Sequence, residues 1–172
     1  MVRNSVTAYV EKGLELARTV MKDDDEIDDY FDEIRDQMIQ LIREADSRDG
    51  RKIFDLIMVT KYLERIGDHA ADISEMTILM SDATYERSAI NIDLVESMAK
   101  ETTDMVIKCV DAFVNKDLEL ARTVIAQDDV VDDLFADFKQ QLIKKINENV
   151  KNGEQATDML MVAKYFERIG DH

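Results

Sequence analysis

The feature that most constrains this chain is an internal repeat. The run Glu-Arg-Ile-Gly-Asp-His occupies residues 64–69 and occurs again, unchanged, at residues 167–172. Upstream, the run Leu-Glu-Leu-Ala-Arg-Thr-Val at residues 14–20 recurs at residues 118–124. A repeat of this length predicts two copies of one structural unit, each made from about half of the chain. The spacing of the two blocks differs by one residue between the copies, which predicts an insertion or deletion in a turn near residues 48–50.

Composition indicates the fold class. The sequence has no proline, only five glycines and 35% charged residues, and its long runs lack the alternation that is typical of strands. These features predict an all-α protein. Together with the repeat they predict two tandem, pseudo-symmetric three-helix bundles, the first at residues 1–82 and the second at residues 83–172.

In the first copy we expect an incomplete first helix, followed by a short helix, a long helix and a third helix. The short helix is predicted at residues 14–21, and an acidic cluster then opens the long helix of residues 23–44. A turn leads to the third helix at residues 51–80, whose inner side is expected to include Leu56 and Leu63.

The second copy is expected to follow the same order with different ends. Its first helix is predicted at residues 92–115, and the counterpart of this helix in the first copy would begin before Met1. Asp117 is placed to cap the helix that follows. The helical pattern continues past the motif to about Met80 in the first copy, whereas the second copy stops at His172. We therefore expect a version of a longer protein that is truncated at both ends.

The net charge and the single cysteine exclude several classes of function. A net charge of −16 at pH 7 opposes nucleic-acid binding, which needs a basic surface, and opposes unaided binding to anionic lipid. Cys109 is the only cysteine, so there is no intrachain disulfide and no thiolate metal cluster, and a reducing cytoplasm is compatible. No apolar run approaches the roughly 20 residues of a membrane span. We expect a cytoplasmic protein that reaches a membrane only through partners.

Acidic residues are paired at helical spacing in and before the repeated motif. Each copy of the motif carries two carboxylates four residues apart, and the acidic cluster upstream carries another such pair. One helical turn separates the members of a pair, so both carboxylates project from the same face. The pairs are Asp24 with Asp28 and Glu64 with Asp68 in the first copy, and Asp128 with Asp132 and Glu167 with Asp171 in the second.

The position of these acids favours a metal site over helix capping. Acids at a helix start complement its dipole, but Asp24 lies on the apolar stripe that continues through Phe31 and Met38. Carboxylates that approach a core without a partner are costly or become protonated unless a cation neutralises them. Where the start of the second helix meets the end of the third, each copy would supply four oxygen ligands, which suit magnesium, manganese or ferric iron. Asp72, one turn beyond Asp68, is a candidate additional ligand.

Two other residue types of the motif are interpreted from their position. Gly67 and Gly170 lie inside helices, where glycine costs up to about 1 kcal/mol relative to alanine. Their repetition predicts a close approach by another backbone or by the metal cluster. His69 and His172 lie off the acidic face, so we expect them to contact the ligands from behind or to be exposed.

These features resemble the PhoU family of bacterial phosphate-signalling proteins. The resemblance covers essentially the whole chain and rests on the doubled motif, on the acidic residues at 24–28 and 128–132, and on the Leu-Glu-Leu-Ala-Arg element at 14–18 and 118–122. It implies two tandem three-helix bundles whose acidic motifs carry multinuclear metal clusters. The metal implied is iron or zinc, with manganese or magnesium in other members.

The same resemblance implies an adaptor without catalytic activity. Such proteins couple the ATPase subunit of the phosphate ABC transporter to a sensor histidine kinase of the phosphate regulon. When phosphate is plentiful, they keep the response off and restrain uptake. By resemblance we therefore expect a homodimeric negative regulator of phosphate homeostasis with these two partners.

Alternatives remain open from the residues alone. A carboxylate-bridged metalloenzyme would need Glu-x-x-His pairs, which the sequence lacks. A purely structural dimerisation bundle would leave the repeated acids without a role, and a melting temperature independent of metal would favour it. The acids would also need no metal if they lay on the surface at a frayed bundle end.

Overall fold

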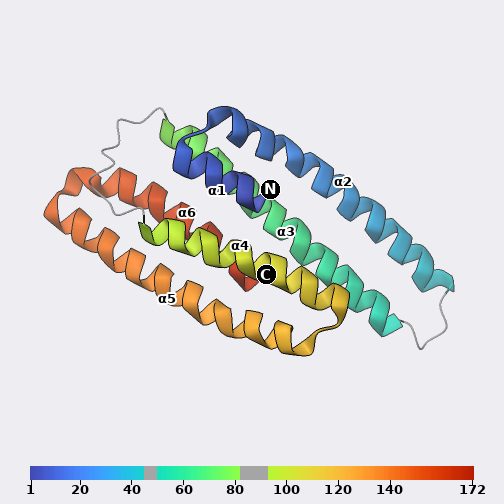
Figure 1. Cartoon of the computed structure of the whole chain (residues 1–172). Coiled ribbons are helices and arrows are strands. Elements are labelled where there is room, and N and C mark those ends of the chain that lie inside the picture. The colour runs from blue at the N-terminus through green and yellow to red at the C-terminus, as the bar shows by residue number, and fades with distance from the viewer. Residues whose placement is uncertain (45–49, 82–92) are drawn as a thin grey trace.

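The fold consists of two similar three-helix units placed side by side (Figure 1). The structure is a computed structural model that describes residues 1–44, 50–81 and 93–172. Within these ranges every regular element is helical. The first unit contains α1 (Val2–Glu11), α2 (Leu14–Glu44) and α3 (Gly50–Ser81), and the second contains α4 (Asp93–Asn115), α5 (Leu118–Glu148), the 3-10 turn Val150–Asn152 and α6 (Gly153–Asp171). The predicted all-α class with two tandem three-helix bundles is confirmed.

The two units meet through their inner helices. In the part of the chain that the structure describes, α3 packs against α6 and α1 packs against α4, whereas the backbones of α2 and α5 pack closely against elements of their own unit. Figure 1 accordingly shows α2 and α5 on opposite outer sides of the molecule. The repeated motif lies on α3 and α6, so both of its copies reach the junction between the units.

The predicted break between a short and a long helix is wrong in both copies. Residues 14–21 and 23–44 belong to the single helix α2, and the equivalent segments form the single helix α5. Ala17 and Val20 are buried, and Asp24 continues the same stripe at helical spacing. The acidic cluster interrupts the run of apolar residues but not the helical spacing of the buried stripe. No proline or glycine lies within α2 to end the helix. The acids therefore lie well inside α2, so they do not cap a helix start.

The turns after the first helix of each unit share one conformation. Lys12 and Lys116 both adopt left-handed backbone angles, with φ of 55° and 56°. Asp117 then caps α5, because its side chain accepts a hydrogen bond of 2.9 Å from the backbone N–H of Leu120. The predicted cap is confirmed, and the sharp turn folds α2 and α5 back along the preceding helices.

Two predicted connections lie outside the described residues. The turn near residues 48–50 falls mostly in residues 45–49, and the predicted boundary between residues 82 and 83 falls in residues 82–92. In the second unit the equivalent turn is the 3-10 turn that precedes α6.

The two units differ in how their third helix is covered. Phe166 of α6 is fully buried, and its backbone carbonyl accepts a hydrogen bond from the Thr102 hydroxyl of α4. Its counterpart Leu63 of α3 is 45% exposed, and Leu56 is also exposed. The prediction that both leucines face the core is therefore wrong. α4, with 23 residues, contacts α6 at Phe166, whereas α1 spans only Val2–Glu11.

No helix in the described part of the chain combines the length and apolar composition that a membrane span requires.

Candidate metal centres

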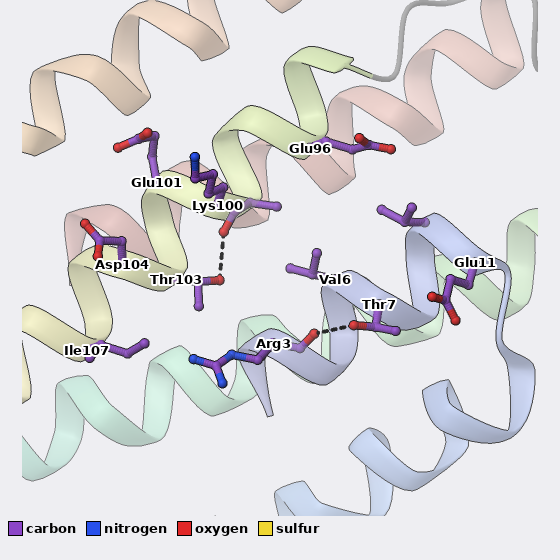
Figure 2. A pocket seen from close by; sticks show the side chains of 12 residues that line it. Arg3, Val6, Thr7, Glu11, Glu96, Lys100, Glu101, Thr103, Asp104 and Ile107 are labelled. Carbon is purple, nitrogen blue, oxygen red and sulfur yellow. Dashed lines mark hydrogen bonds between the residues drawn. The ribbon is translucent and has the colours of Figure 1, made fainter.

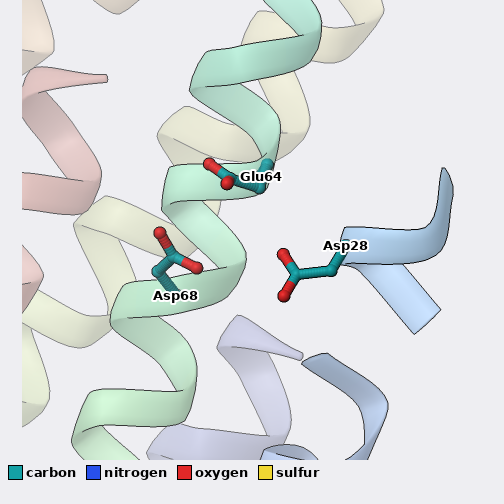
Figure 3. Close-up of side chains that lie close together, drawn as sticks. All are labelled: Asp28, Glu64 and Asp68. Carbon is teal, nitrogen blue, oxygen red and sulfur yellow. The ribbon is translucent and has the colours of Figure 1, made fainter. Parts of the chain in front are cut away.

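α2 and α3 bring the predicted acids of the first copy together within the bundle. One carboxylate oxygen each of Asp28, Glu64 and Asp68 lie within 4.8 Å of one another (Figure 3). The equivalent oxygens on α5 and α6 show the same grouping in the second unit. We call these groups, each with the nearby aspartate one turn earlier in its outer helix, the first acidic centre (Asp24, Asp28, Glu64, Asp68) and the second acidic centre (Asp128, Asp132, Glu167, Asp171).

Asp24 and Asp128 lie beside these groups and are half-buried. One carboxylate oxygen of each is inaccessible to solvent and has no hydrogen-bond partner. A Cβ placed on Gly67 would lie 3.2 Å from Oδ1 of Asp24, and one on Gly170 would lie 3.1 Å from Oδ1 of Asp128. Both glycines are approached closely, but by an aspartate carboxylate and not by another backbone, and the alternative of a close metal cluster stays a prediction.

Burial and mutual repulsion perturb the carboxylates of both centres. Burial, followed by the charges of Asp68 and Asp28, raises the pKa of Asp24 to about 6. Burial also raises the pKa of Asp68, with Glu64 as the next cause. In the second centre burial and the neighbouring acids raise the pKa of Asp128 in the same direction. The protein alone therefore leaves these negative charges incompletely compensated.

Each centre contains a lysine that sequence reasoning missed, and in the second centre Arg168 also donates to Oδ2 of Asp171, at 3.0 Å. The Lys61 ammonium donates to both carboxylate oxygens of Glu64, at 2.5 Å each. Lys164 donates in the same way to both oxygens of Glu167, at 2.5 Å to Oε1. The signal was present in the sequence, since a lysine stands three residues before the glutamate in both copies.

The chemistry of both centres fits a hard metal ion. Two oxygens bound to the same ion at about 2.0–2.6 Å are separated by at most roughly 5 Å, and the three grouped carboxylates of each centre meet this limit. The donor set consists of oxygen alone, which suits magnesium, manganese, calcium or ferric iron. The unpartnered buried oxygen of Asp24, and that of Asp128, would gain the partner that each lacks.

Asp72 occupies a different position from the other predicted ligands. Its carboxylate lies 3.2 Å from Nδ1 of His69 and outside the close group of three. It lines a hollow of about 400 Å³ together with Asp24, Asp68 and Glu75. Its role as an additional ligand stays a prediction.

The two histidines form a ring stack at the junction of the units. The rings of His69 and His172 lie 5.5 Å apart and are nearly parallel, at 9°. Tyr165 stacks on His69 and Tyr62 stacks on His172, at 5.7 Å and 5.8 Å. His69 contacts Asp72, so the expectation that the histidines contact ligands from behind stays a prediction, and the stack itself was not expected. Neither imidazole belongs to a close group of acids.

A further hollow of about 660 Å³ opens between α1 and α4 (Figure 2). Its lining mixes four acids, two bases and apolar side chains. The residues that illustrate this are Arg3, Lys100, Glu11, Glu96, Glu101, Asp104, Val6 and Ile107. Nothing in this lining selects a ligand, and the acidic centres remain the candidate site.

Comparison with known proteins identifies the family. Residues 1–77 and 95–172 match the family model of the PhoU domain. The chain belongs to the PhoU family. The two matched segments correspond to the two units of the fold, and the predicted resemblance is confirmed.

Curated relatives share most of the chain. A phosphate-specific transport system accessory protein PhoU homolog from Aquifex aeolicus is 32% identical over 169 residues, which are 97% of this chain and 75% of that protein. A homolog of the same name from Clostridium acetobutylicum is 33% identical over 162 residues, which are 91% of this chain and 71% of that protein.

Crystal structures of PhoU proteins show the same fold. PhoU from Pseudomonas aeruginosa superimposes with a TM-score of 0.93 at 24% identity, over 99% of this chain and 82% of the other. The phosphate transport system regulatory protein PhoU from Streptococcus pneumoniae superimposes with a TM-score of 0.85 at 19% identity. The paired three-helix units are therefore the arrangement seen in PhoU structures.

Proposed function

We propose that this chain regulates phosphate transport as a PhoU-type adaptor. The observation that carries this proposal is the match of both units to the PhoU domain, together with relatives named accessory proteins of the phosphate-specific transport system over nearly the whole chain. In the proposed role the protein couples the ATPase subunit of the phosphate ABC transporter to the sensor histidine kinase. It restrains uptake and regulon expression when phosphate is abundant.

The proposed adaptor is a cytoplasmic homodimer that meets the membrane only through these partners. Its net charge of −16 supports contacts with proteins rather than with nucleic acid or anionic lipid. The relatives are named as accessory proteins, which supports a regulator without a reaction of its own.

In this proposal the two acidic centres each hold a metal cluster. Iron or zinc is the first candidate, and manganese or magnesium is the next. The bound ions would supply positive charge between the outer helix and the motif helix of each unit. Asp24, Asp28, Glu64 and Asp68 would hold them in the first unit, and Asp128, Asp132, Glu167 and Asp171 in the second. The unpartnered buried oxygens of Asp24 and Asp128 are the main support for this assignment.

A carboxylate-bridged metalloenzyme is less well supported. That class takes histidine ligands from the helices that carry its acids. Here the rings of His69 and His172 stack on each other and on tyrosines, outside the close groups of acids.

The regulatory role is tested in cells that lack this gene. Secreted or periplasmic phosphatase activity is measured in phosphate-replete medium, with and without the restored gene. High activity that the restored gene suppresses is the expected result. Unchanged activity after deletion, with no second PhoU gene present, would overturn the regulatory role.

The metal centres are tested separately on the purified protein. The double substitution Asp24→Asn with Asp28→Asn is expected to reduce bound metal and the melting temperature, because it replaces two negatively charged carboxylates of the first centre by neutral amides. The matched control is Asp128→Asn with Asp132→Asn, which should remove the metal of the second centre only. Elemental analysis that finds unchanged metal in both variants would exclude these four residues as necessary ligands and would favour a purely structural bundle.

A further inference from the structure

Both acidic centres contain a lysine whose ammonium group is hydrogen-bonded to the glutamate carboxylate. Lys61 donates to both oxygens of Glu64, and Lys164 donates to both oxygens of Glu167. The segments that carry the contact, residues 61–69 and 164–172, differ only at Leu63 and Phe166, and the contact is the same in both units. Its repetition indicates a property of the centre rather than an accidental surface pair.

The glutamate is the buried partner of this pair. The Glu64 side chain is 12% exposed and that of Lys61 is 41% exposed, and Glu167 and Lys164 differ in the same direction. The carboxylate is thus fixed in the centre, while the ammonium approaches it from the solvent side. A carboxylate that accepts hydrogen bonds from an ammonium through both oxygens is a weaker ligand for a metal ion, and two cations on one carboxylate also repel each other.

The same ammonium also lies over an aromatic ring while it contacts the glutamate. Nζ of Lys61 is 5.0 Å from the ring centre of Phe31, and Nζ of Lys164 is 5.2 Å from that of Phe135. Both rings lie within the range of a cation–π contact. An ammonium that leaves the glutamate can therefore remain over the phenyl ring.

We propose that Lys61 and Lys164 are internal counter-cations that compete with metal ions for Glu64 and Glu167 and thereby set the affinity of each centre. The inference rests on the proposed metal binding. In the metal-free centre the lysine neutralises the glutamate. When a metal ion binds, the ammonium moves from the carboxylate towards the ring of Phe31 or Phe135.

The test is the affinity of the full chain for Mn²⁺, measured by titration and by the electron paramagnetic resonance signal of free Mn²⁺. Lys61→Met keeps an unbranched side chain that is one atom shorter and removes its charge. It should lower the Kd of the first centre by about three- to tenfold, the range expected when a half-exposed ion pair no longer competes. Lys61→Arg keeps the charge and should retain a Kd close to that of the wild type.

Two further variants separate competition from a general effect of charge or fold. Lys144→Met removes the same charge from an exposed position on α5 that lies about 18 Å along the helix from Asp132, and it should leave both Kd values unchanged. Phe31→Leu removes the alternative position of the ammonium and should raise the Kd of the first centre. This effect should disappear when Phe31→Leu is combined with Lys61→Met.

The outcomes distinguish this inference from the metal assignment on which it rests. A Kd that stays the same or rises in Lys61→Met, and also in the equivalent Lys164→Met, overturns the role of the lysines. An effect of Phe31→Leu that persists without Lys61 overturns the proposed movement. If the double variant Asp28→Asn with Asp68→Asn binds Mn²⁺ as the wild type does, the metal centre itself is overturned, and the inference with it.

Discussion

Gly67 determines how closely the Asp24 carboxylate can approach α3. A side chain at this position would meet Oδ1 of Asp24 at 3.2 Å and Cγ2 of Ile27 at 3.3 Å. Both distances are shorter than ordinary van der Waals contact, so any Cβ would push α2 and α3 apart or turn the carboxylate away. The glycine is conformationally costly in the middle of a helix, and the buried position of Asp24 is its structural reason.

Gly67→Ala is therefore expected to weaken metal binding at the first centre more than it weakens the fold. Alanine stabilises the helix by up to about 1 kcal/mol, which offsets part of the cost of the close contact, so the free energy of unfolding should change by less than about 1 kcal/mol. Metal titration and urea unfolding measure the two effects. The control is Gly153→Ala, where a Cβ meets nothing within 4 Å. Full metal affinity in Gly67→Ala would contradict the role of the glycine.

The raised pKa of Asp24 predicts how the stability of the metal-free protein depends on pH. The folded pKa is about 6 and the unfolded value is about 4, so the folded state binds this proton more tightly. The contribution of Asp24 to the free energy of unfolding therefore increases as pH falls from about 7 to about 4. As the pH falls over this range, the melting temperature of the wild type, measured with a chelator, should rise relative to that of Asp24→Asn.

The comparison with Asp24→Asn is needed because another group acts in the opposite direction. Burial lowers the pKa of His172, so this group favours the folded state less as pH falls below the ordinary histidine range. A melting-temperature difference between wild type and Asp24→Asn that does not change between pH 7 and pH 4 would refute the prediction for Asp24.

At the scale of elements, the helices could be predicted from the sequence, whereas the continuity of α2 and α5 through the acidic cluster could not. The repeat and the apolar period predicted α3 and α4 nearly residue for residue. The acidic cluster was interpreted as a helix start because acids favour that position, although Ala17, Val20 and Asp24 share one uninterrupted period. Periodicity was the better guide here, because packing of the stripe against α3 outweighs the local preference of acids for helix ends.

The acids of the candidate site were predictable for the same reason, and their surroundings were not. Pairs at one-turn spacing on facing stripes predicted which carboxylates would be close. The unpartnered oxygens of Asp24 and Asp128 and the contact of Lys61 with Glu64 depend on rotamers and on the distance between helices. Sequence spacing does not determine those quantities.

The continuity of α2 can be tested with a proline at Lys22, an exposed position just before the acids. Inside a continuous helix Lys22→Pro removes a backbone hydrogen bond and clashes with the preceding turn, at a cost of about 3 kcal/mol. Two separate helices would place this residue in a turn, where proline is tolerated. Chemical unfolding compares Lys22→Pro with the control Lys22→Ala. Equal stability of the two variants would argue for a break in α2.

For the whole molecule, the ring stack is a specific contact between the two units. It joins His69 of α3 to His172 of α6, with a tyrosine on each side. Because both histidines belong to the repeated motif, the same sequence element supplies acids of the two acidic centres and the ring contact between the units.

Tyr165→Leu is expected to destabilise the protein by about 1 kcal/mol. The substitution keeps an apolar side chain but removes the ring contact with His69, and such contacts contribute about 0.5–1.5 kcal/mol beyond their buried area. Urea unfolding measures the loss. The control is Tyr30→Leu, since Tyr30 is 60% exposed. A loss in Tyr30→Leu as large as that in Tyr165→Leu would mean that the stack has no special contribution.

The same stack has a consequence for the origin of the chain. Tyr62 contacts His172 and Tyr165 contacts His69, so one pair of equivalent positions makes the same contact twice, in reciprocal order. Reciprocal contacts are the mark of an isologous interface between identical subunits about a two-fold axis. A gene for a single three-helix subunit that formed such a dimer, and was then duplicated and fused, would give this arrangement. Each half would inherit a complete acidic centre, free to diverge while the ancestral interface holds the halves together.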